Sequence, residues 1–484
     1  MKTIATTALA LLTVVSLNGQ QGALDRSKVP PPGPAPQLRV PAWTKAKLAN
    51  GAELIVSEKH DLPLVSFSIT FQGGADQIET PAKRGVAAMT AAMLLEGTKT
   101  KDGEALSNAL QLLGTSVQAG VGGESGTIRF TSTTAKFEPT LAILADILQN
   151  PTFPAEALER QRAQRLVALQ QARNQGPAIA NRVFPRVLYG TDHPFGQATS
   201  EDTIKAITRE DLVALHRAYF TPSHALVTVV GDVNTAAVKA TVQRALASWT
   251  APAAASAEFN AFKYPALPKS KETTIYLVDR PGAAQSSVAI GLPGPPRDTP
   301  DYYPLAVLNM MLGGHIQSRL SANIREEKGY SYGVRSSFDF GHGPGAFRAG
   351  GEIVGEKTDL ALIEFMKELK GVQGARPITD EELAMTRDAL SQRLLGTFGS
   401  VAGTDNAITT IWLQGLPEDY YQQYARRIAA VTKDDVLRVA KQYVDLNHVA
   451  IVVVGDRKSI ESGLKGTGIA PVVILDGTGA PAGS

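Results

Sequence analysis

The segment GYSYG at residues 329–333 has the G-x-S-x-G spacing around a serine nucleophile. In serine hydrolases with this motif, the serine lies on a turn that follows a strand and opens a helix. Here residues 323–328 (NIREEK) have helical character and residues 333–338 (GVRSSF) have strand character, so the order is reversed. No pattern supplies acidic and histidine partners for Ser331. A serine hydrolase that uses Ser331 is therefore only a remote alternative.

Arg325 and Tyr332 lie seven positions apart, with Gly329 between them. Guanidinium and phenol groups are donors that can hold a peptide carbonyl or a developing oxyanion. The spacing allows one residue at the end of a helix and the other on the following strand. The alternative is that Arg325 pairs with Glu326 or Glu327 on a solvated face and that Tyr332 is an ordinary strand aromatic.

A metal site is hard to assemble from this sequence. The chain has no cysteine, so thiolate ligands, disulfides and cysteine nucleophiles are all absent. None of its histidines forms the i, i+4 pair that shares a metal on one helical face. The seven histidines are His60, His193, His216, His224, His315, His342 and His448.

Length and charge set broad limits on the class of protein. The chain has 484 residues, which predicts at least two domains, and its content of 43% hydrophobic and 19% charged residues is that of a globular protein. The net charge is +2, with no run of five basic residues. Nucleic acid is therefore not an expected partner.

The N-terminus predicts export. Lys2 precedes a 14-residue run at 4–17 that is apolar except for Thr and Ser, and small residues follow at Gly19, Gly22 and Ala23. This pattern indicates a signal peptide at 1–23, and an uncleaved membrane anchor is the alternative. Because the run is shorter than the roughly 20 residues of a spanning helix, we expect cleavage and no membrane attachment afterwards. The mature protein is expected to be soluble and either periplasmic or otherwise exported.

Two long segments of the chain repeat each other. Residues 205–233 and 429–457 match without a gap at a constant separation of 224 positions. A period of that length indicates a duplicated domain rather than a solenoid repeat. Matched pairs include Thr208 and Thr432, Asp211 and Asp435, Tyr219 and Tyr443, and His224 and His448.

Each half contains both helix and strand patterns. Thr208 and the acidic residues after it predict a capped helix start. Residues 225–230 (ALVTVV) and 449–454 (VAIVVV) predict buried strands, and the alternation at 64–71 (LVSFSITF) predicts a half-buried strand. The fold class is therefore α+β, with two homologous domains that each have a largely antiparallel sheet flanked by helices. Helices are expected at 85–96, 102–113, 137–148, 155–174, 360–369 and 379–395.

Several stretches resemble the M16 peptidases, the pitrilysin and insulinase family. They are LANGAELIV at 48–56, GVAAMTAAMLLEGT at 85–98, YGTDHPFGQAT at 189–199, TPSHALVTVVGDV at 221–233 and LGGHIQSRLSANIREEKGYSYGV at 312–334. The resemblance implies half of a clamshell, organised as a signal peptide (1–23), a Pro-rich spacer (24–44), an N-terminal domain (45–250), a linker (251–270), a C-terminal domain (271–462) and a tail (463–484).

Active members of this family carry H-x-x-E-H on a helix of the first domain. Two histidines at i and i+4 can share zinc, and the glutamate activates the bound water. The resemblance puts those positions at Ala88, Ala91 and Ala92, so the motif is degenerate. It puts a third ligand near 167–169, where no glutamate occurs. This chain is thus expected to have no catalytic residue, no metal and no cofactor of its own.

The resemblance also implies a role for Arg325 and Tyr332. In the family such a pair holds the bound peptide across a cavity from the zinc. Some bacterial members divide the work, so that one chain carries zinc and a second carries the Arg/Tyr pair. We therefore expect a peptide substrate and a heterodimer with an active H-x-x-E-H subunit, which alone would bind zinc. A stand-alone peptide-binding or scaffold protein is the alternative.

Overall fold

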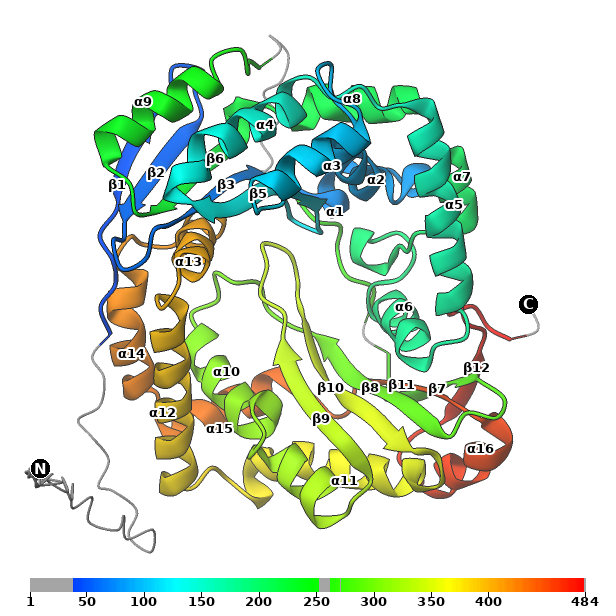
Figure 1. Ribbon diagram of the computed structural model, residues 1–484. Coiled ribbons are helices and arrows are strands. Elements are labelled where there is room, and N and C mark those ends of the chain that lie inside the picture. Colours follow the sequence, from blue (N-terminus) through cyan, green and yellow to red (C-terminus); the bar gives the residue numbers. More distant parts are fainter. Residues whose placement is uncertain (1–37, 252–261, 270, 483–484) are drawn as a thin grey trace, which may run out of the picture. The chain divides into compact units, whose positions relative to one another are not determined.

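The computed structural model describes residues 38–251, 262–269 and 271–482 (Figure 1). The predicted signal peptide, most of the Pro-rich spacer and the first part of the predicted linker lie outside these ranges. Of the described linker residues, Tyr264 is half-buried and its neighbours are exposed. Within the described ranges, no helix has the length and apolar character needed to cross a membrane.

The first sheet has the strand order β1-β2-β6-β3-β5-β4. All neighbours are antiparallel except β2 and β6, which are parallel. Its inner strands are rich in β-branched and aromatic residues, which suit a pleated surface that is buried. The strands are β1 (Thr44–Lys47), β2 (Glu53–Glu58), β3 (Leu64–Gln72), β4 (Gln118–Val121), β5 (Ser125–Thr133) and β6 (Ala225–Gly231).

The second sheet has the order β12-β7-β11-β8-β10-β9, in which the five strands after β12 repeat the order of the five strands after β1 in the first sheet. The pairs β12–β7 and β7–β11 are parallel and the others are antiparallel. The equal strand orders confirm the predicted duplication and the α+β class. The strands are β7 (Thr274–Asp279), β8 (Gln285–Pro293), β9 (Ser331–Phe338), β10 (Ala346–Val354), β11 (Ala450–Gly455) and β12 (Val472–Leu475).

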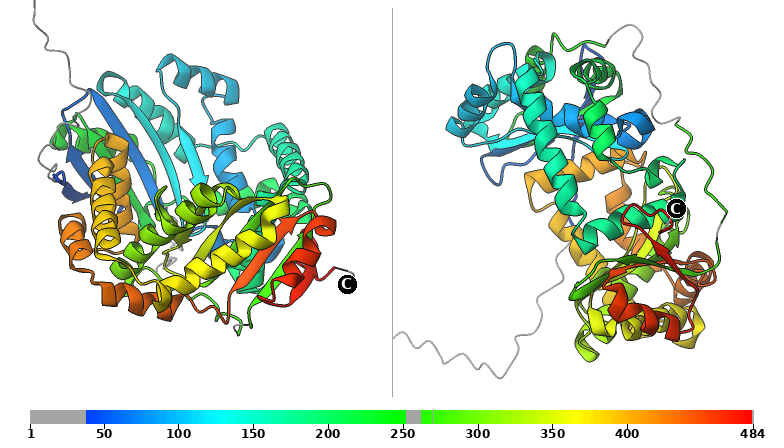
Figure 2. Two further views of the ribbon diagram at one scale, coloured as in Figure 1. Left: turned by 90° about the horizontal axis from the view of Figure 1, so that it is seen from below. Right: turned by 90° about the vertical axis from the view of Figure 1, so that its right-hand side faces the viewer.

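Helices connect and cover both sheets (Figures 1 and 2). Those of the first half are α1 (Ala75–Ile78), α2 (Val86–Met93), α3 (Gly103–Leu112), α4 (Phe137–Gln149), α5 (Ala155–Ala172), α6 (Gly176–Tyr189), α7 (Glu201–Ala206), α8 (Arg209–Tyr219) and α9 (Thr235–Ala245). Those of the second half are α10 (Tyr302–Asn309), α11 (Thr358–Lys370), α12 (Asp380–Thr397), α13 (Val401–Leu413), α14 (Tyr420–Ala430), α15 (Lys433–Tyr443) and α16 (Arg457–Gly466).

Local sequence signals explain where the repeated helices begin. Thr208 accepts a hydrogen bond from the backbone N–H of Asp211, and the Asp211 side chain accepts one from the backbone N–H of Thr208. Thr432 and Asp435 form the same reciprocal pair at the start of α15. Each pair satisfies two backbone donors that a helix start leaves open. The predicted N-cap is confirmed in both halves.

One helix of each half packs on the sheet of the other half. On α6, Val183 and Phe184 join a core with β7, β8 and β11, and on α13, Val401 and Ile408 pack with Leu226 of β6. These helices cover the faces opposite α11 and α4. The prediction of a half-buried strand at 64–71 is wrong for this reason, because α13 also buries Ser66 and its neighbours on the second face of β3.

A buried carboxylate ties α13 to β3. Asp405 accepts hydrogen bonds from the hydroxyls of Ser66 (2.9 Å) and Ser68 (2.7 Å). Burial raises the pKa of Asp405 to about 6, because the charged form is poorly solvated there. The contact between the halves therefore includes a group that titrates in mildly acidic solution.

A second contact between the halves joins two hairpin turns. Glu124, between β4 and β5, accepts hydrogen bonds from the backbone N–H of His342 (2.9 Å) and Gly343 (3.2 Å), between β9 and β10. A Cβ atom at Gly341 would lie 2.6 Å from a carboxylate oxygen of Glu124. Glycine at this position thus permits the close approach of the two turns.

The C-terminal end of the chain differs from the predicted tail at 463–484. The predicted boundary at 462 falls inside α16, and residues 472–475 form β12 beside β7. A four-residue strand with polar and glycine-rich flanks carries too weak a pattern to be separated from a loop by sequence.

Candidate functional site

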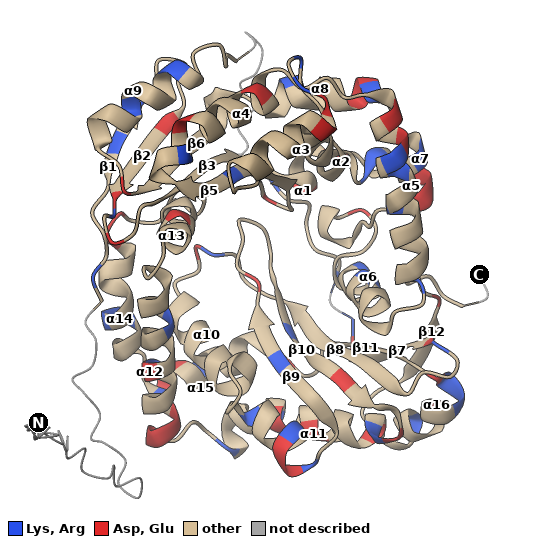
Figure 3. Ribbon diagram, in the orientation of Figure 1, with Lys and Arg blue, Asp and Glu red and all other residues tan. Residues whose placement is uncertain are grey.

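Helix α2 presents methyl groups where the resemblance implies metal ligands. Ala88 and Ala92 are half-buried and lie one turn apart on one face, and Ala91 is 1% exposed. Thr90, the only polar side chain of α2, donates to the carbonyl of Val86 at 2.8 Å. Figure 3 shows no charged residue on α2. The helix therefore offers packing surface and no group that could ligate a metal or transfer a proton.

Helix α5 brings a cation to this face. Nη2 of Arg165 donates a hydrogen bond to the carbonyl of Ala88 at 3.0 Å. Burial lowers the pKa of the Arg165 guanidinium, which nevertheless stays protonated. Its Nε is buried and has no hydrogen-bond partner among the described residues. Val167, at the predicted third-ligand segment, is 51% exposed and carries no ligand atom.

Arg325 and Tyr332 lie at the beginning of the outermost strand of the second sheet. Arg325 belongs to the helical segment η8 (Ser321–Glu327), and Tyr332 is the second residue of β9. Gly329 has a φ of +66°, which turns the chain between them. The Arg325 side chain is 37% exposed and its Nε lies 3.3 Å from Glu326, whereas Tyr332 is 88% exposed. Both donors are thus accessible to a ligand, and the ion pair with Glu326 would compete for one of them.

Ser331 is engaged with the backbone. Its hydroxyl donates to the carbonyls of Glu352 (2.6 Å) and Gly333 (3.0 Å) and accepts from the N–H of Gly333 (3.0 Å). The segment before it is helical and the segment after it is a strand, which confirms the reversed order. No imidazole contacts this hydroxyl among the described residues, so the geometry opposes the serine hydrolase alternative.

Two family profiles match the chain. The profile described as Insulinase (Peptidase family M16) matches residues 54–191, and the one described as Peptidase M16 inactive domain matches residues 206–390. The chain belongs to the M16 peptidase family. The matched ranges contain α2, α5, Arg325 and Tyr332.

Relatives in the M16 family carry both active and inactive names. An uncharacterized zinc protease of Bacillus subtilis, YmxG, is 23% identical over 72% of this chain and 82% of its own length. A protein of Helicobacter pylori named non-peptidase homolog YmxG is 22% identical over 84% of this chain and 92% of its own.

Solved structures show the same fold. The peptidase M16 inactive domain of Pseudomonas fluorescens has a TM-score of 0.76 and 25% identity, over 85% of this chain and 98% of that chain. A protease of Helicobacter pylori has a TM-score of 0.75 and 19% identity, over 86% and 99%. Because these chains are covered almost completely, the likeness extends over both halves of the M16 fold.

A zinc ion does not fit the described residues at the ligand positions that the resemblance implies. Zinc takes His, Cys, Asp or Glu ligands, and Ala88, Ala91 and Ala92 supply none. The Arg165 guanidinium, which donates to the Ala88 carbonyl, would repel a cation bound there. Across the described ranges, no cluster of three or more His, Asp or Glu side chains could hold a metal ion.

The sequence reasoning missed Arg165 and Asp405. Arg165 lies two to four positions before the predicted third-ligand segment. A positive residue so close to an expected metal ligand was a signal against a metal site, in addition to the absence of glutamate. Asp405 is the one charged residue of α13 (VAGTDNAITTIWL). A single acid in an otherwise uncharged helix signals a buried polar contact, although the sequence does not name the partner.

Proposed function

We propose that this M16 chain is the non-catalytic, peptide-holding partner of an H-x-x-E-H subunit in a two-chain metallopeptidase. The observation that carries the proposal is the face of α2, where Ala88 and Ala92 offer only methyl groups and Arg165 donates to the Ala88 carbonyl. The resemblance puts two ligand positions of active members on this face. Catalysis of peptide hydrolysis would then need metal and base from another chain.

Arg325 and Tyr332 supply the holding function in this proposal. Two accessible donors of different reach can bind two carbonyls of an extended peptide, or one carbonyl whose negative charge grows during hydrolysis. When a peptide binds, Arg325 would exchange its exposed contact with Glu326 for a peptide carbonyl. Such an exposed ion pair costs little to break, because water already screens it.

Export belongs to the same proposal. The N-terminal pattern at 1–23 would send the chain out of the cytoplasm, and its partner should then carry an export signal too. The name non-peptidase homolog, given to the Helicobacter pylori relative, supports a non-catalytic role. We therefore propose a periplasmic or otherwise exported heterodimer with a clamshell cavity between its subunits.

A mixing experiment tests the proposed function. This chain, an H-x-x-E-H M16 protein from a neighbouring gene, and their mixture are each incubated with a fluorogenic peptide, and co-elution is followed by gel filtration. We expect a complex that cleaves the peptide and requires zinc, and no cleavage by this chain alone. Chelator-sensitive cleavage by the isolated chain would contradict the proposal. Peptide binding with no complex would favour the stand-alone binding or scaffold alternative.

A further inference from the structure

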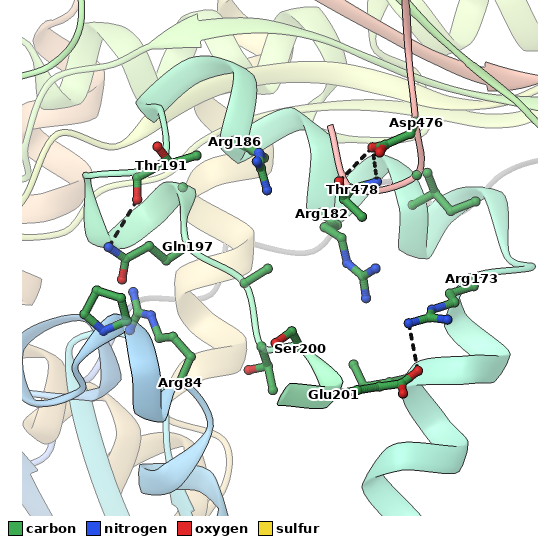
Figure 4. A pocket seen from close by; sticks show the side chains of 17 residues that line it. Arg84, Arg173, Arg182, Arg186, Thr191, Gln197, Ser200, Glu201, Asp476 and Thr478 are labelled. Atoms are coloured by element: carbon green, nitrogen blue, oxygen red, sulfur yellow. Dashed lines mark hydrogen bonds and ion pairs between the residues drawn. The ribbon is translucent and has the colours of Figure 1, made fainter. Parts of the chain in front are cut away.

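A cavity of about 630 Å³ lies beside α6, and none of its lining residues belongs to α2 or β9 themselves. Figure 4 shows the side chains that line it. They come from α6 and Thr191 after it, the segment 196–201 before and into α7, the C-terminal turn 476–478, Pro81 and Arg84 before α2, and Leu169 and Arg173 at the end of α5. Its size is in the range of sites that hold a small organic ligand or a few residues of a peptide.

Two arginines in this cavity have no counter-ion. Arg182 and Arg186 lie one turn apart on α6, both are half-buried, and neither side chain makes an ion pair or hydrogen bond with any described residue. Like charges at i and i+4 disfavour a helix by a few tenths of a kcal/mol. An anion between the two guanidinium groups would remove this repulsion and satisfy their donors.

The other two arginines that line the cavity are already neutralised. The Arg84 side chain is buried and lies 3.4 Å from both Asp76 and Glu79. Arg173 forms a 2.7 Å ion pair with Glu201. The free positive charge is therefore concentrated on α6.

The acidic group opposite α6 is also engaged. Asp476 accepts hydrogen bonds from the backbone N–H of Thr478 (2.8 Å) and Ala480 (3.0 Å), and from the Thr478 hydroxyl. These donors, against the opposing effect of burial, keep its pKa below the usual value. Asp476 thus fixes the turn that closes the cavity through its Oδ1 atom, which accepts all three hydrogen bonds.

The remaining lining gives the cavity two kinds of surface. The hydroxyl groups of Thr199 and Ser200 can donate to an oxyanion, whereas the Thr191 hydroxyl already donates to Asp192 at 3.4 Å. Leu169, Ile179 and Ala198 form apolar wall beside them. Guanidinium forks match the two oxygens of a carboxylate, and apolar wall suits a carbon chain attached to it.

We infer that this cavity is a binding site for a carboxylate attached to an apolar group, as at the C-terminal residue of a peptide. Arg182 and Arg186 hold the carboxylate, and Leu169 and Ile179 contact the attached apolar part. The inference does not depend on a partner subunit or on Arg325 and Tyr332, so it can fail while the proposed function holds, and the reverse.

Calorimetric titration of the full mature chain tests the site. The probes are N-acetyl-Ala-Ala-Leu with a free carboxylate, the same tripeptide as its amide, N-acetylleucine, and inorganic phosphate. We expect the free tripeptide to bind at least tenfold more tightly than its amide. Weaker binding of N-acetylleucine would identify a peptide C-terminus as the ligand, and equal binding would identify a small organic acid.

Variants connect the binding to α6. Arg182→Gln and Arg186→Gln should each weaken the free tripeptide about tenfold or more, because each removes a charged donor. The matched control is Arg244→Gln on α9, which is exposed and distant from the cavity. Equal affinity for acid and amide, absence of binding, tighter binding of phosphate, or unchanged affinity in both α6 variants would overturn the inference. The acid and amide comparison uses the unmodified protein, so it stands even if a variant misfolds.

Discussion

The two halves of the molecule share five strands in the same order and differ in the sixth. In the first sheet β1 precedes β2 in the chain and pairs with it antiparallel, whereas in the second sheet β12 comes last and pairs with β7 parallel. An outer strand can join in either direction because it needs one row of partners only. The duplicated unit is therefore the five-stranded core with its helices. The sixth strand comes from a different part of the chain in each half.

The helix after the long inner strand gives the functional part of this comparison. In the first half α2 (VAAMTAAM) follows β3, and in the second half α10 and the helical segment η7 (Met310–Gly314) follow β8 with the sequence YYPLAVLNMMLGG. Neither contains a charged residue. The helix on which the resemblance puts the zinc motif thus resembles its counterpart in the second half in having no charged side chain.

The halves also depend on each other for burial. Because α6 and α13 each cover the sheet of the opposite half, neither sheet can bury both faces with its own helices. This exchange predicts that the halves unfold together.

The largest expected effect therefore comes from the crossing helices. Ile408→Ala on α13 and Ile179→Ala on α6 each remove a buried side chain from one of the two crossing helices. Each should lower the free energy of unfolding by about 2–5 kcal/mol, as for other buried isoleucines. Urea unfolding followed by circular dichroism measures this, with a single transition expected in both variants.

An exposed isoleucine provides the control for this pair. Ile363→Ala on α11, where the side chain is 42% exposed, should change stability by less than about 0.5 kcal/mol. Two separate transitions in either crossing-helix variant would show that the halves are independent.

The second prediction concerns Arg325 and Tyr332, the peptide-holding pair that we propose for the second half. Arg325→Ala or Tyr332→Phe should leave the chain folded and paired, and should lower the turnover of the mixed complex on the order of 100-fold. Loss of one donor to a developing oxyanion costs about 3–4 kcal/mol. Bound zinc should not change. Tyr330→Phe, two residues before Tyr332, is the matched control, and normal turnover in the double variant would leave the pair with a structural role only.

The third prediction concerns the pH dependence of the contact between α13 and β3. The pKa of Asp405 is about 6 in the folded chain and 3.8 is its ordinary value. Between these pH values the folded chain holds a proton that the unfolded chain has released, so stability falls as pH rises from 4 to 6. Over that window the loss is on the order of 2–3 kcal/mol.

Asp405→Asn tests this pH dependence. The amide does not titrate, so the difference in unfolding free energy between variant and parent should grow in the variant's favour from pH 4.5 to pH 7. Comparing the two proteins cancels the titration of all other groups. Asp434→Asn, exposed on α15, should show no such trend. A parallel pH dependence for parent and Asp405→Asn would contradict the role of this carboxylate.

Features set by neighbouring residues were predictable from the sequence. The capping pairs at Thr208 and Thr432, the strands β6 and β11, and the alanines of α2 all follow from short patterns. The packing of α6 and α13 on the sheet of the opposite half could not be predicted. The apolar and polar residues of β3 alternate in the same way whether the polar face is exposed to water or covered by a helix from the other half. The sequence predicts exposed side chains for Ser66 and Ser68, whereas in the structure both donate to Asp405 of α13.

Charge placement at the candidate site was equally non-local. Sequence reasoning established that α2 lacks ligands, and it could not establish that Arg165 binds the carbonyl of Ala88. The sequence also could not predict that Arg182 and Arg186 lack counter-ions. That depends on which acidic residues pair with Arg84 and Arg173 in the folded chain. Partner choice among many arginines is a property of the folded chain.

The smallest expected effect concerns zinc binding by a variant of α2 that carries the family's H-x-x-E-H motif. Restoring the motif with Ala88→His, Ala91→Glu and Ala92→His places two imidazoles on one face, and Arg165 then lies beside them. A unit charge about 4 Å from a cation costs up to about 4 kcal/mol at the dielectric of a protein surface. We expect weak zinc binding in this triple variant and at least tenfold tighter binding when Arg165→Met is added, measured by competition with a zinc-sensitive dye. Arg160→Met, on the same helix but paired with Glu96, should not tighten it. If Arg165→Met also has no effect, the charge on α5 does not exclude the metal, and the missing third ligand alone separates this half from an active one.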